Sequence, residues 1–514
     1  MFSGLIFTDT EGLSATLSCT RKEIQTVIGN YINKCEKYIQ WQFVDVADSM
    51  YDDILDLNDW GTYANILNDY YIGLGFDGME NIPLFIIGGD EIIPMPKIEN
   101  PIGTVGGEYL YSDMLFGFET DASYIAFVQQ SSKYAVGRLP FNEENTLADL
   151  ITYLEKCVNL QSKGIDVRGA AMTTTESWLS ASAEMMRDIP MAKLSPDNVP
   201  LSNRMIVSPL LDTSEKDWYD GYVKELKKTD FLVCNLHGSD GKDSKETAYF
   251  FGEDKDCDRR LVYYATQPSM LKIHSPLVFN TVACWGARYA DYKQDESMLL
   301  TAMANGTMIY CGACTTALGG YAGTAGNSEL LMKLFCIYLH KGIPAGTAMI
   351  KAKQDYYRTC HSEDSDALAM FTILEFNLFC CPLLAMNPKL PDKYEPLLMG
   401  MRISNNRHCT YNPVKAVPIG DNAYSADDVL SYIRRRVDDN LSLIREKVEK
   451  EVYQRLGLGR DNLQQTFRLT MNDVQIGWRF LYQWTPQTSN RYFQMYYLID
   501  ADTNGKIKRI IQTK

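Results

Sequence analysis

The stretch FLVCNLHGS, residues Phe231 to Ser239, decides the fold class and carries the first candidate functional residue. Its nearly continuous apolar start predicts a strand that is buried on both faces, as strands of parallel sheets are. The strand runs directly into His237 and Gly238. Because open parallel sheets collect functional groups at their carboxyl edge, the sequence places an imidazole at that edge.

A second buried strand, Leu277 to Ala283, runs in the same way into Cys284, Trp285 and Gly286. A thiol and an imidazole at the tips of two strands form the arrangement that a cysteine nucleophile with a histidine base requires. The two residues are 284 − 237 = 47 positions apart, which leaves room for one crossover connection. We therefore expect the two strands to be neighbours in one sheet.

The combination of the two residues carries this prediction, because a single histidine or cysteine is usually a packing residue. Of the 13 cysteines, only Cys284 follows a buried strand and precedes a turn that ends in glycine. The other histidines lack the context of a strand followed by glycine: His274, His340, His361 and His408.

Strands alternate with helices along most of the chain, which predicts an α/β fold with a doubly wound, mostly parallel sheet flanked by helices. Strands are predicted at 82–87, 134–136, 169–175, 231–236, 277–283 and 306–310, and helices at about 143–160, 181–188 and 297–304. Three domains are expected: an N-terminal α/β subdomain (1–145), a catalytic α/β subdomain (146–395) and a C-terminal region (396–514).

The C-terminal region has its own pattern. Residues 390–421 look like a connector with a short β segment, and a long helix is predicted from a capping pair at Ser425 and Asp428 to Gly457. An alternation of apolar and polar residues from Phe467 onward predicts a small β meander. A hairpin turn is expected at Asn504 and Gly505.

Composition excludes several classes of protein. With 50 basic and 65 acidic residues among 514, the net charge of −15 repels phosphate backbones and anionic lipid, so no nucleic-acid or membrane partner is expected. No run is long enough for a membrane span and no export signal is visible at the start, so we expect a cytoplasmic protein with reduced thiols.

The blocks Asn235 to Ser239 and Phe279 to Gly286 resemble the His-Gly and Ala-Cys signatures of caspase-like (clan CD) cysteine peptidases, most closely the bacterial gingipain family. Further blocks resemble family motifs in the same order: 84–90 with Ile93-Pro94, 111–113, 136–140, 306–310 and 379–384. The resemblance covers about residues 80 to 385. It implies a caspase-like fold and a cysteine endopeptidase.

The resemblance also implies roles for individual residues. Cys284 would attack the scissile carbonyl, His237 would protonate the leaving amine, and the N–H groups of Gly238 and Cys284 would bind the oxyanion. Glu176, after the strand at 169–175, occupies the place of the family acid that orients the histidine, although a helix N-terminal acid is nearly as good an interpretation. Substrate binding is assigned to Glu184, Asp188 and Trp285.

No cofactor is expected. Gingipains carry structural calcium, but no ligands for it can be mapped here. Cys311 and Cys314 match the C-x-x-C pattern of a zinc or redox site, but no second pair accompanies them, so a packing role is favoured.

The partners expected are a protein or peptide substrate and a regulatory protein at the C-terminal region. The segment between His237 and Cys284 is long and charged, and a solvated surface loop is the commoner interpretation of such a run; the alternative is a loop that covers the cleft or is cut during activation. A partner, a ligand or self-cleavage is expected to gate the activity. Two alternatives stay open: a catalytically silent scaffold for protein interaction, and a transferase or ligase that uses the same thioester.

Overall fold

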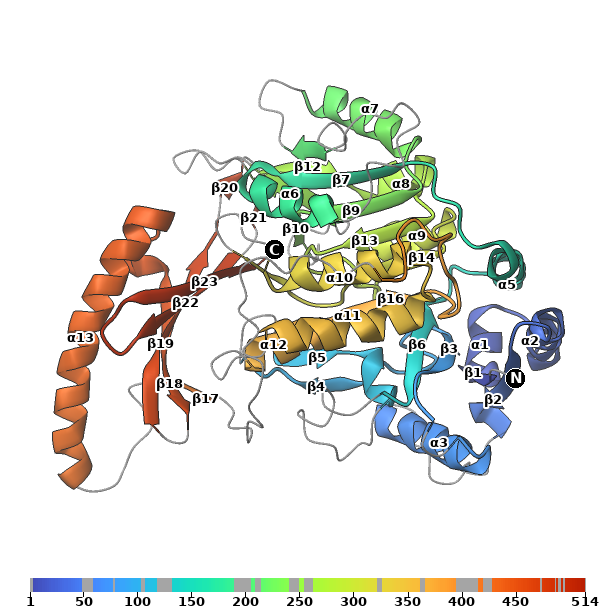
Figure 1. The fold of residues 1–514 in the computed structure, drawn as a ribbon, viewed down its shortest axis with the longest axis horizontal. Coiled ribbons are helices and arrows are strands. Elements are labelled where there is room, and N and C mark those ends of the chain that lie inside the picture. The colour runs from blue at the N-terminus through green and yellow to red at the C-terminus, as the bar shows by residue number, and fades with distance from the viewer. Residues whose placement is uncertain are drawn as a thin grey trace.

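A computed structural model describes residues 3–48, 59–76, 79–102, 107–117, 132–188, 205–208, 214–239, 249–253, 262–320, 326–360, 366–393, 415–418, 428–471, 474–485, 487–488, 491–492 and 495–513. Within these ranges, no helix combines the length and the apolar character needed to cross a bilayer. We describe the chain as three units, each built on one of the sheets of four or more strands, in the order from blue at the N-terminus to red at the C-terminus in Figure 1.

The first unit is built on the N-terminal sheet, four parallel strands in the order β2-β1-β3-β6. The strands are β1 (Ser3–Thr8), β2 (Gln40–Asp45), β3 (Ile82–Ile87) and β6 (Tyr134–Leu139), with a small pair β4 (Lys97–Glu99) and β5 (Tyr109–Tyr111). The helices are α1 (Thr10–Thr16), α2 (Arg21–Cys35), α3 (Trp60–Gly73) and α5 (Leu147–Lys163). β1 and β2 were not recognised in the sequence, and β6 extends three residues beyond the predicted strand.

A fully buried ion pair lies where this unit meets the next one. Arg138 on β6 binds both carboxylate oxygens of Asp113, at 2.6 and 2.8 Å, and donates to the carbonyls of Gly88 at 3.0 Å and Ile93 at 2.7 Å. The Asp113 backbone N–H donates to Asn377 Oδ1 at 2.9 Å. Several sequence blocks that resemble family motifs therefore meet around one buried guanidinium.

The second unit is built on the central sheet, six strands in the order β16-β14-β13-β9-β7-β8, in which only β16 is antiparallel to its neighbour. The strands are β7 (Ala170–Thr175), β8 (Met205–Ser208), β9 (Phe231–Asn235), β13 (Val278–Thr281), β14 (Ile309–Ala313) and β16 (Phe376–Phe379). The helices are α6 (Leu179–Asp188), α7 (Glu215–Leu226), α8 (Pro268–Ile273), α9 (Met298–Ala304), α10 (Ser328–His340), α11 (Ala345–Cys360) and α12 (Asp366–Glu375).

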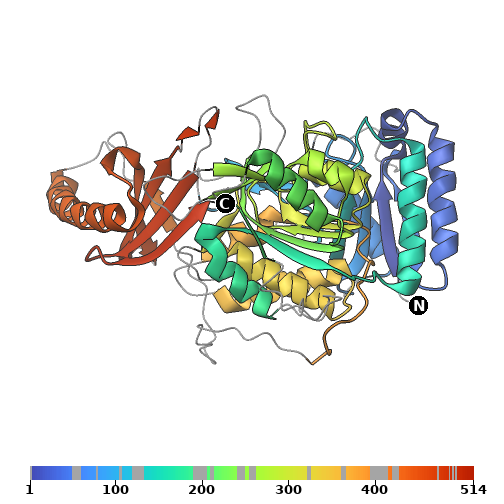
Figure 2. The same ribbon diagram turned by 90° about the horizontal axis from the view of Figure 1, so that it is seen from above.

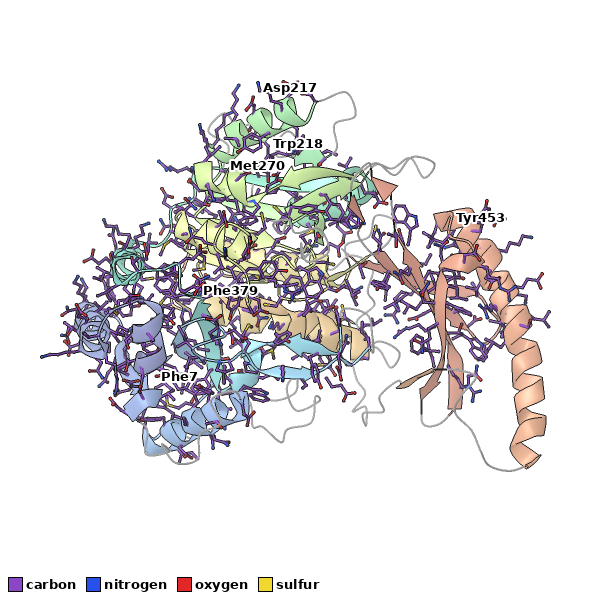
Figure 3. All side chains as sticks on the ribbon, turned by 180° about the vertical axis from the view of Figure 1, so that it is seen from behind. Phe7, Asp217, Trp218, Met270, Phe379 and Tyr453 are labelled. Carbon is purple, nitrogen blue, oxygen red and sulfur yellow. The ribbon has the colours of Figure 1, made fainter. Side chains whose placement is uncertain are left out.

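Helices cover both faces of the central sheet, and Figure 2 shows α7 on one face with α6 and α10 on the other. Alternate residues of β9 divide between the two sides: Leu232 and Cys234 pack in a cluster with α7, α8 and α9, whereas Phe231 and Val233 belong to the cluster of α6 and α10. Figure 3 marks Trp218 and Met270 on the α7 and α8 side. The predicted α/β fold with a mostly parallel sheet between helices is confirmed.

The third unit contains helix α13 (Asp428–Leu456) and the C-terminal sheet, six antiparallel strands in the order β15-β23-β22-β19-β18-β17. The strands are β15 (Leu318–Gly320), β17 (Lys415–Pro418), β18 (Leu463–Met471), β19 (Val474–Trp484), β22 (Met495–Asp502) and β23 (Ile507–Thr513), beside a small pair β20 (Gln487–Thr488) and β21 (Arg491–Tyr492). β15 belongs by sequence to the second unit, so this sheet bridges two units. The expected hairpin turn is confirmed, with Gly505 at φ 79°.

The start of α5 and the position of β14 differ from the predicted ones. α5 begins at Leu147 and not near residue 143, because Thr146 caps it: Thr146 and Asp149 exchange backbone N–H and side-chain oxygen hydrogen bonds at 2.8 and 3.3 Å. β14 occupies 309–313 and not 306–310, since Gly306 has a φ of 111° that a strand does not allow. Ser425, and the connector except β17, lie outside the described residues.

Candidate active site

The two strands that carry the candidate residues are neighbours, as predicted. β9 and β13 are parallel, with Val278 opposite Phe231 and Thr281 opposite Cys234. The pairing continues past both strands, because the Val282 N–H donates to the Cys234 carbonyl at 2.9 Å. The chain segments that contain His237 and Cys284 thus leave the sheet side by side at its carboxyl edge.

The space around Gly238 shows how closely these two segments approach each other. A Cβ atom at Gly238 would lie 1.8 Å from the carbonyl oxygen of Cys284 and 3.1 Å from its backbone nitrogen. No side chain fits in that space, so glycine is required here for close packing of two backbones. The residue after the histidine therefore touches the backbone of the cysteine itself.

His237 is held from three sides. Its Nε2 lies 3.0 Å from Glu253 Oε2, and the two side chains are 1% and 3% exposed. The imidazole ring centroid is 4.3 Å from that of Trp178 and 5.2 Å from that of Phe251, which stacks at an interplanar angle of 16°. A carboxylate at Nε2 can fix both the orientation and the tautomer of the imidazole.

The contact of Glu253 with His237 was not predicted, because the segment after His237 was interpreted as a solvated loop. This interpretation is wrong for the described part, which forms an insertion sheet of β10 (His237–Ser239), β11 (Tyr249–Glu253) and β12 (Val262–Thr266). All five residues of β11 are buried. The Glu253 backbone is fixed by Thr175 Oγ1, which donates to its carbonyl and accepts from its N–H, both at 2.5 Å.

A sequence signal for β11 existed. Tyr249, Phe250 and Phe251 form an aromatic run with strong strand propensity inside an otherwise charged segment. Such a run predicts a buried strand, and its register opposite β10 sets His237 against Phe251. That pairing brings the following acid to the imidazole.

Cys284 is 4% exposed, and its sulfur lies against Ala317. The Ala317 N–H donates to Sγ at 3.2 Å, and Sγ lies 3.4 Å from the Ala317 carbonyl oxygen. The next residue, Trp285, has a φ of 58°, and its N–H donates to the Thr315 carbonyl at 2.7 Å. The Arg288 guanidinium lies 4.8 Å from the centre of the Trp285 indole. The strained turn at Trp285 presents the thiol beside the loop that follows β14.

The structure describes the remaining predicted site residues in less detail. Glu176 begins a short 3-10 helix, Glu176–Trp178, at the tip of β7, but its side chain lies outside the described residues, as does that of Asp188. Glu184 is half-buried on α6. This helix packs behind the sheet through Ser182, which is 2.6 Å from Thr174 Oγ1 and 2.8 Å from Asn235 Nδ2.

The two cysteine side chains of the C-x-x-C pattern are not directed toward a common partner. Cys311 and Cys314 lie in different core clusters on opposite sides of the central sheet. Burial raises the pKa of the Cys314 thiol to about 12, which keeps it protonated. In the described part of the chain, no group of three or more His, Cys, Asp or Glu side chains is arranged to hold a metal ion.

No protein-family model matches the chain. No curated protein matches it either. Among solved structures, the Arg-specific cysteine proteinase gingipain R (RGPB) is 10% identical with a TM-score of 0.49, over 100% of this chain and 97% of that one.

The complex of Porphyromonas gingivalis RgpB pro- and mature domains is 9% identical with a TM-score of 0.48, over 100% and 99% of the two chains. The Saccharomyces cerevisiae separase-securin complex is 13% identical with a TM-score of 0.34, over 66% of this chain and 18% of that one.

Proposed function

We propose that this protein is a cysteine endopeptidase. In the proposed reaction, Cys284 Sγ attacks the carbonyl carbon of a peptide bond, and His237 transfers a proton to the leaving amine as the C–N bond breaks. Water then hydrolyses the thioester, which releases the acid product and restores the thiol. The proposal includes the cytoplasmic location that the sequence leads us to expect.

The observation that carries the proposal is the contact between Gly238 and Cys284. It brings the backbones of the imidazole and thiol segments together at the carboxyl edge of the central sheet, where α/β folds place their chemistry. The N–H groups of Gly238 and Cys284 are proposed to stabilise the oxyanion, and Trp285, Glu184 and Asp188 to contact the substrate.

Glu253 is the proposed positioning residue for His237. A buried carboxylate at 3.0 Å fixes the ring orientation and stabilises the imidazolium that forms when the thiol is deprotonated. Glu176 stays a second proposal for this role, because its backbone lies at the tip of β7, next to the strand that precedes His237.

A peptide library tests the proposal. The purified wild-type chain should cleave a defined subset of peptides, and Cys284→Ala should abolish both cleavage and labelling by a thiol-reactive peptide probe. Cys311→Ala is the matched control, since it removes a buried thiol of the same sheet. Undiminished cleavage by Cys284→Ala would show that Cys284 is not the nucleophile.

The second candidate function, a catalytically silent scaffold for protein interaction, is favoured by one observation. Cys284 is nearly buried, and its sulfur is engaged by Ala317. A scaffold would show no cleavage of any peptide and no labelling of Cys284 under conditions in which the chain is folded. A transferase would instead give conjugates with an added amine.

A further inference from the structure

The C-terminal sheet contacts both segments that hold the candidate catalytic residues. The first contact is at the cysteine. Ala317, which binds Cys284 Sγ through its N–H, is followed directly by β15. β15 is paired in antiparallel fashion with the last strand of the chain, β23, with Leu318 opposite Thr513 and Gly320 opposite Ile511. Figures 1 and 2 show the C-terminal end of the chain next to the central sheet.

The second contact is at the histidine. Tyr249 and Phe251 of β11 pack in one apolar cluster with Val448 of α13 and with Trp478 and Tyr497 of the C-terminal sheet. Phe251 also stacks on the imidazole of His237. The same strand that orients the histidine is thereby part of the core of the C-terminal unit.

Both candidate catalytic side chains are closed off in this arrangement. The cysteine and the histidine are 4% and 1% exposed, so a peptide carbonyl cannot reach the sulfur unless a neighbouring segment moves. Ala317 contacts the sulfur through both its backbone N–H and its carbonyl oxygen. Its position is set by β15, whose backbone is paired with β23 and whose Leu318 carbonyl accepts from Ser328 Oγ at 2.5 Å.

We propose that the C-terminal sheet is a latch that keeps the site closed, and that a peptide gains access to Cys284 when β23 separates from β15. The biological purpose of the latch rests on the proposed function, but the burial of Cys284 and His237 is a property of the fold. Strand pairing suits a latch, because backbone hydrogen bonds at a sheet edge can be exchanged for those of another extended segment.

The test weakens the latch in the full-length chain. Ile511 is 1% exposed and packs in the main core with Phe467, Leu481 and Leu498, so Ile511→Asp places a charge where β23 must be buried. Lys508→Asp is the matched control, because it introduces the same group on the same strand at a side chain that is 58% exposed. Circular dichroism and thermal unfolding establish that each variant is folded.

The readout is the rate at which iodoacetamide alkylates Cys284, followed by peptide mass spectrometry. Ile511→Asp should raise this rate by about tenfold or more, and Lys508→Asp should leave it unchanged. An unchanged rate in folded Ile511→Asp overturns the latch. A raised rate without peptide cleavage by any variant supports the latch and overturns the proposed function, so the two failures are distinguishable.

Hydrogen exchange of the wild-type chain decides the question if Ile511→Asp does not fold. After Cys284 has been modified by a thiol-reactive peptide probe, residues 511–513 should exchange faster than before. Modification of Cys284 with unchanged protection of these residues overturns the proposal.

Discussion

Replacing Gly238 by alanine is the sharpest test of the geometry at the candidate site. The added Cβ would lie 1.8 Å from the carbonyl oxygen of Cys284, whereas ordinary van der Waals contact begins at 3.4 Å. The two backbones would have to separate by about 1.6 Å, and both belong to segments anchored in the central sheet. Overpacking of this kind costs about 1 to 3 kcal/mol of stability.

The effect on turnover should be larger than the effect on stability. A misplacement of about 1 Å between reacting groups can reduce a rate by about 100-fold, so Gly238→Ala should lose at least that factor in kcat/KM. The assay is hydrolysis of a fluorogenic peptide selected from the library, with thermal unfolding measured on the same samples.

Gly221→Ala is the control for a glycine that has room. No atom lies within 4 Å of the position of its added Cβ, and the residue is in helix α7. Alanine should stabilise that helix by up to about 1 kcal/mol without changing turnover. If Gly238→Ala keeps kcat/KM within about threefold of wild type, the close approach of the two segments is refuted.

Three further predictions concern single buried side chains. Glu253→Gln should lower kcat by about 100-fold or more with little change in KM, and Glu253→Asp should recover part of the loss; equal effects on kcat and KM would contradict a positioning role. Arg138→Met should lower the free energy of unfolding by about 3 to 5 kcal/mol, because Asp113 stays buried without its partner. The double variant Arg138→Met, Asp113→Leu should recover most of that loss in urea denaturation. Finally, burial lowers the pKa of His340 from 6.5 to about 4. The unfolded chain then takes up a proton below pH 6.5 that the native chain does not accept until about pH 4, so native stability should fall across that window as the pH falls. His340→Leu should show a smaller loss between pH 6.5 and 4; identical pH slopes would show that His340 is not responsible.

The candidate dyad could be predicted because its information is local. A run of apolar residues such as Phe231 to Leu236 predicts a buried strand, and the residue that follows it in the chain must lie at the strand tip. The neighbouring positions of β9 and β13 were expected because the chain between them leaves room for one crossover connection. Chain order and the carboxyl edge of a parallel sheet therefore located His237 and Cys284 without any side-chain detail.

Glu253 illustrates why the acid proposed to orient His237 could not be found in this way. It was one acidic residue among many in a charged segment, and what distinguishes it is the pairing of β11 with β10. Strands pair through backbone hydrogen bonds. Because every residue offers the same backbone groups, the side chains of a strand do not identify its partner. The buried pair of Arg138 and Asp113 was equally hidden, although the blocks that contain both residues had been singled out.

The order of apolar runs along the chain was enough to predict an α/β fold with a thiol and an imidazole at the tips of adjacent strands. The contacts of Glu253 with the imidazole and of Ala317 with the thiol, and the pairing of β23 with β15, became visible only in the folded chain. The physical reason is the range of the interactions. Hydrophobic periodicity depends on residues that are close in sequence, whereas close packing and strand pairing occur between segments that are far apart in the chain.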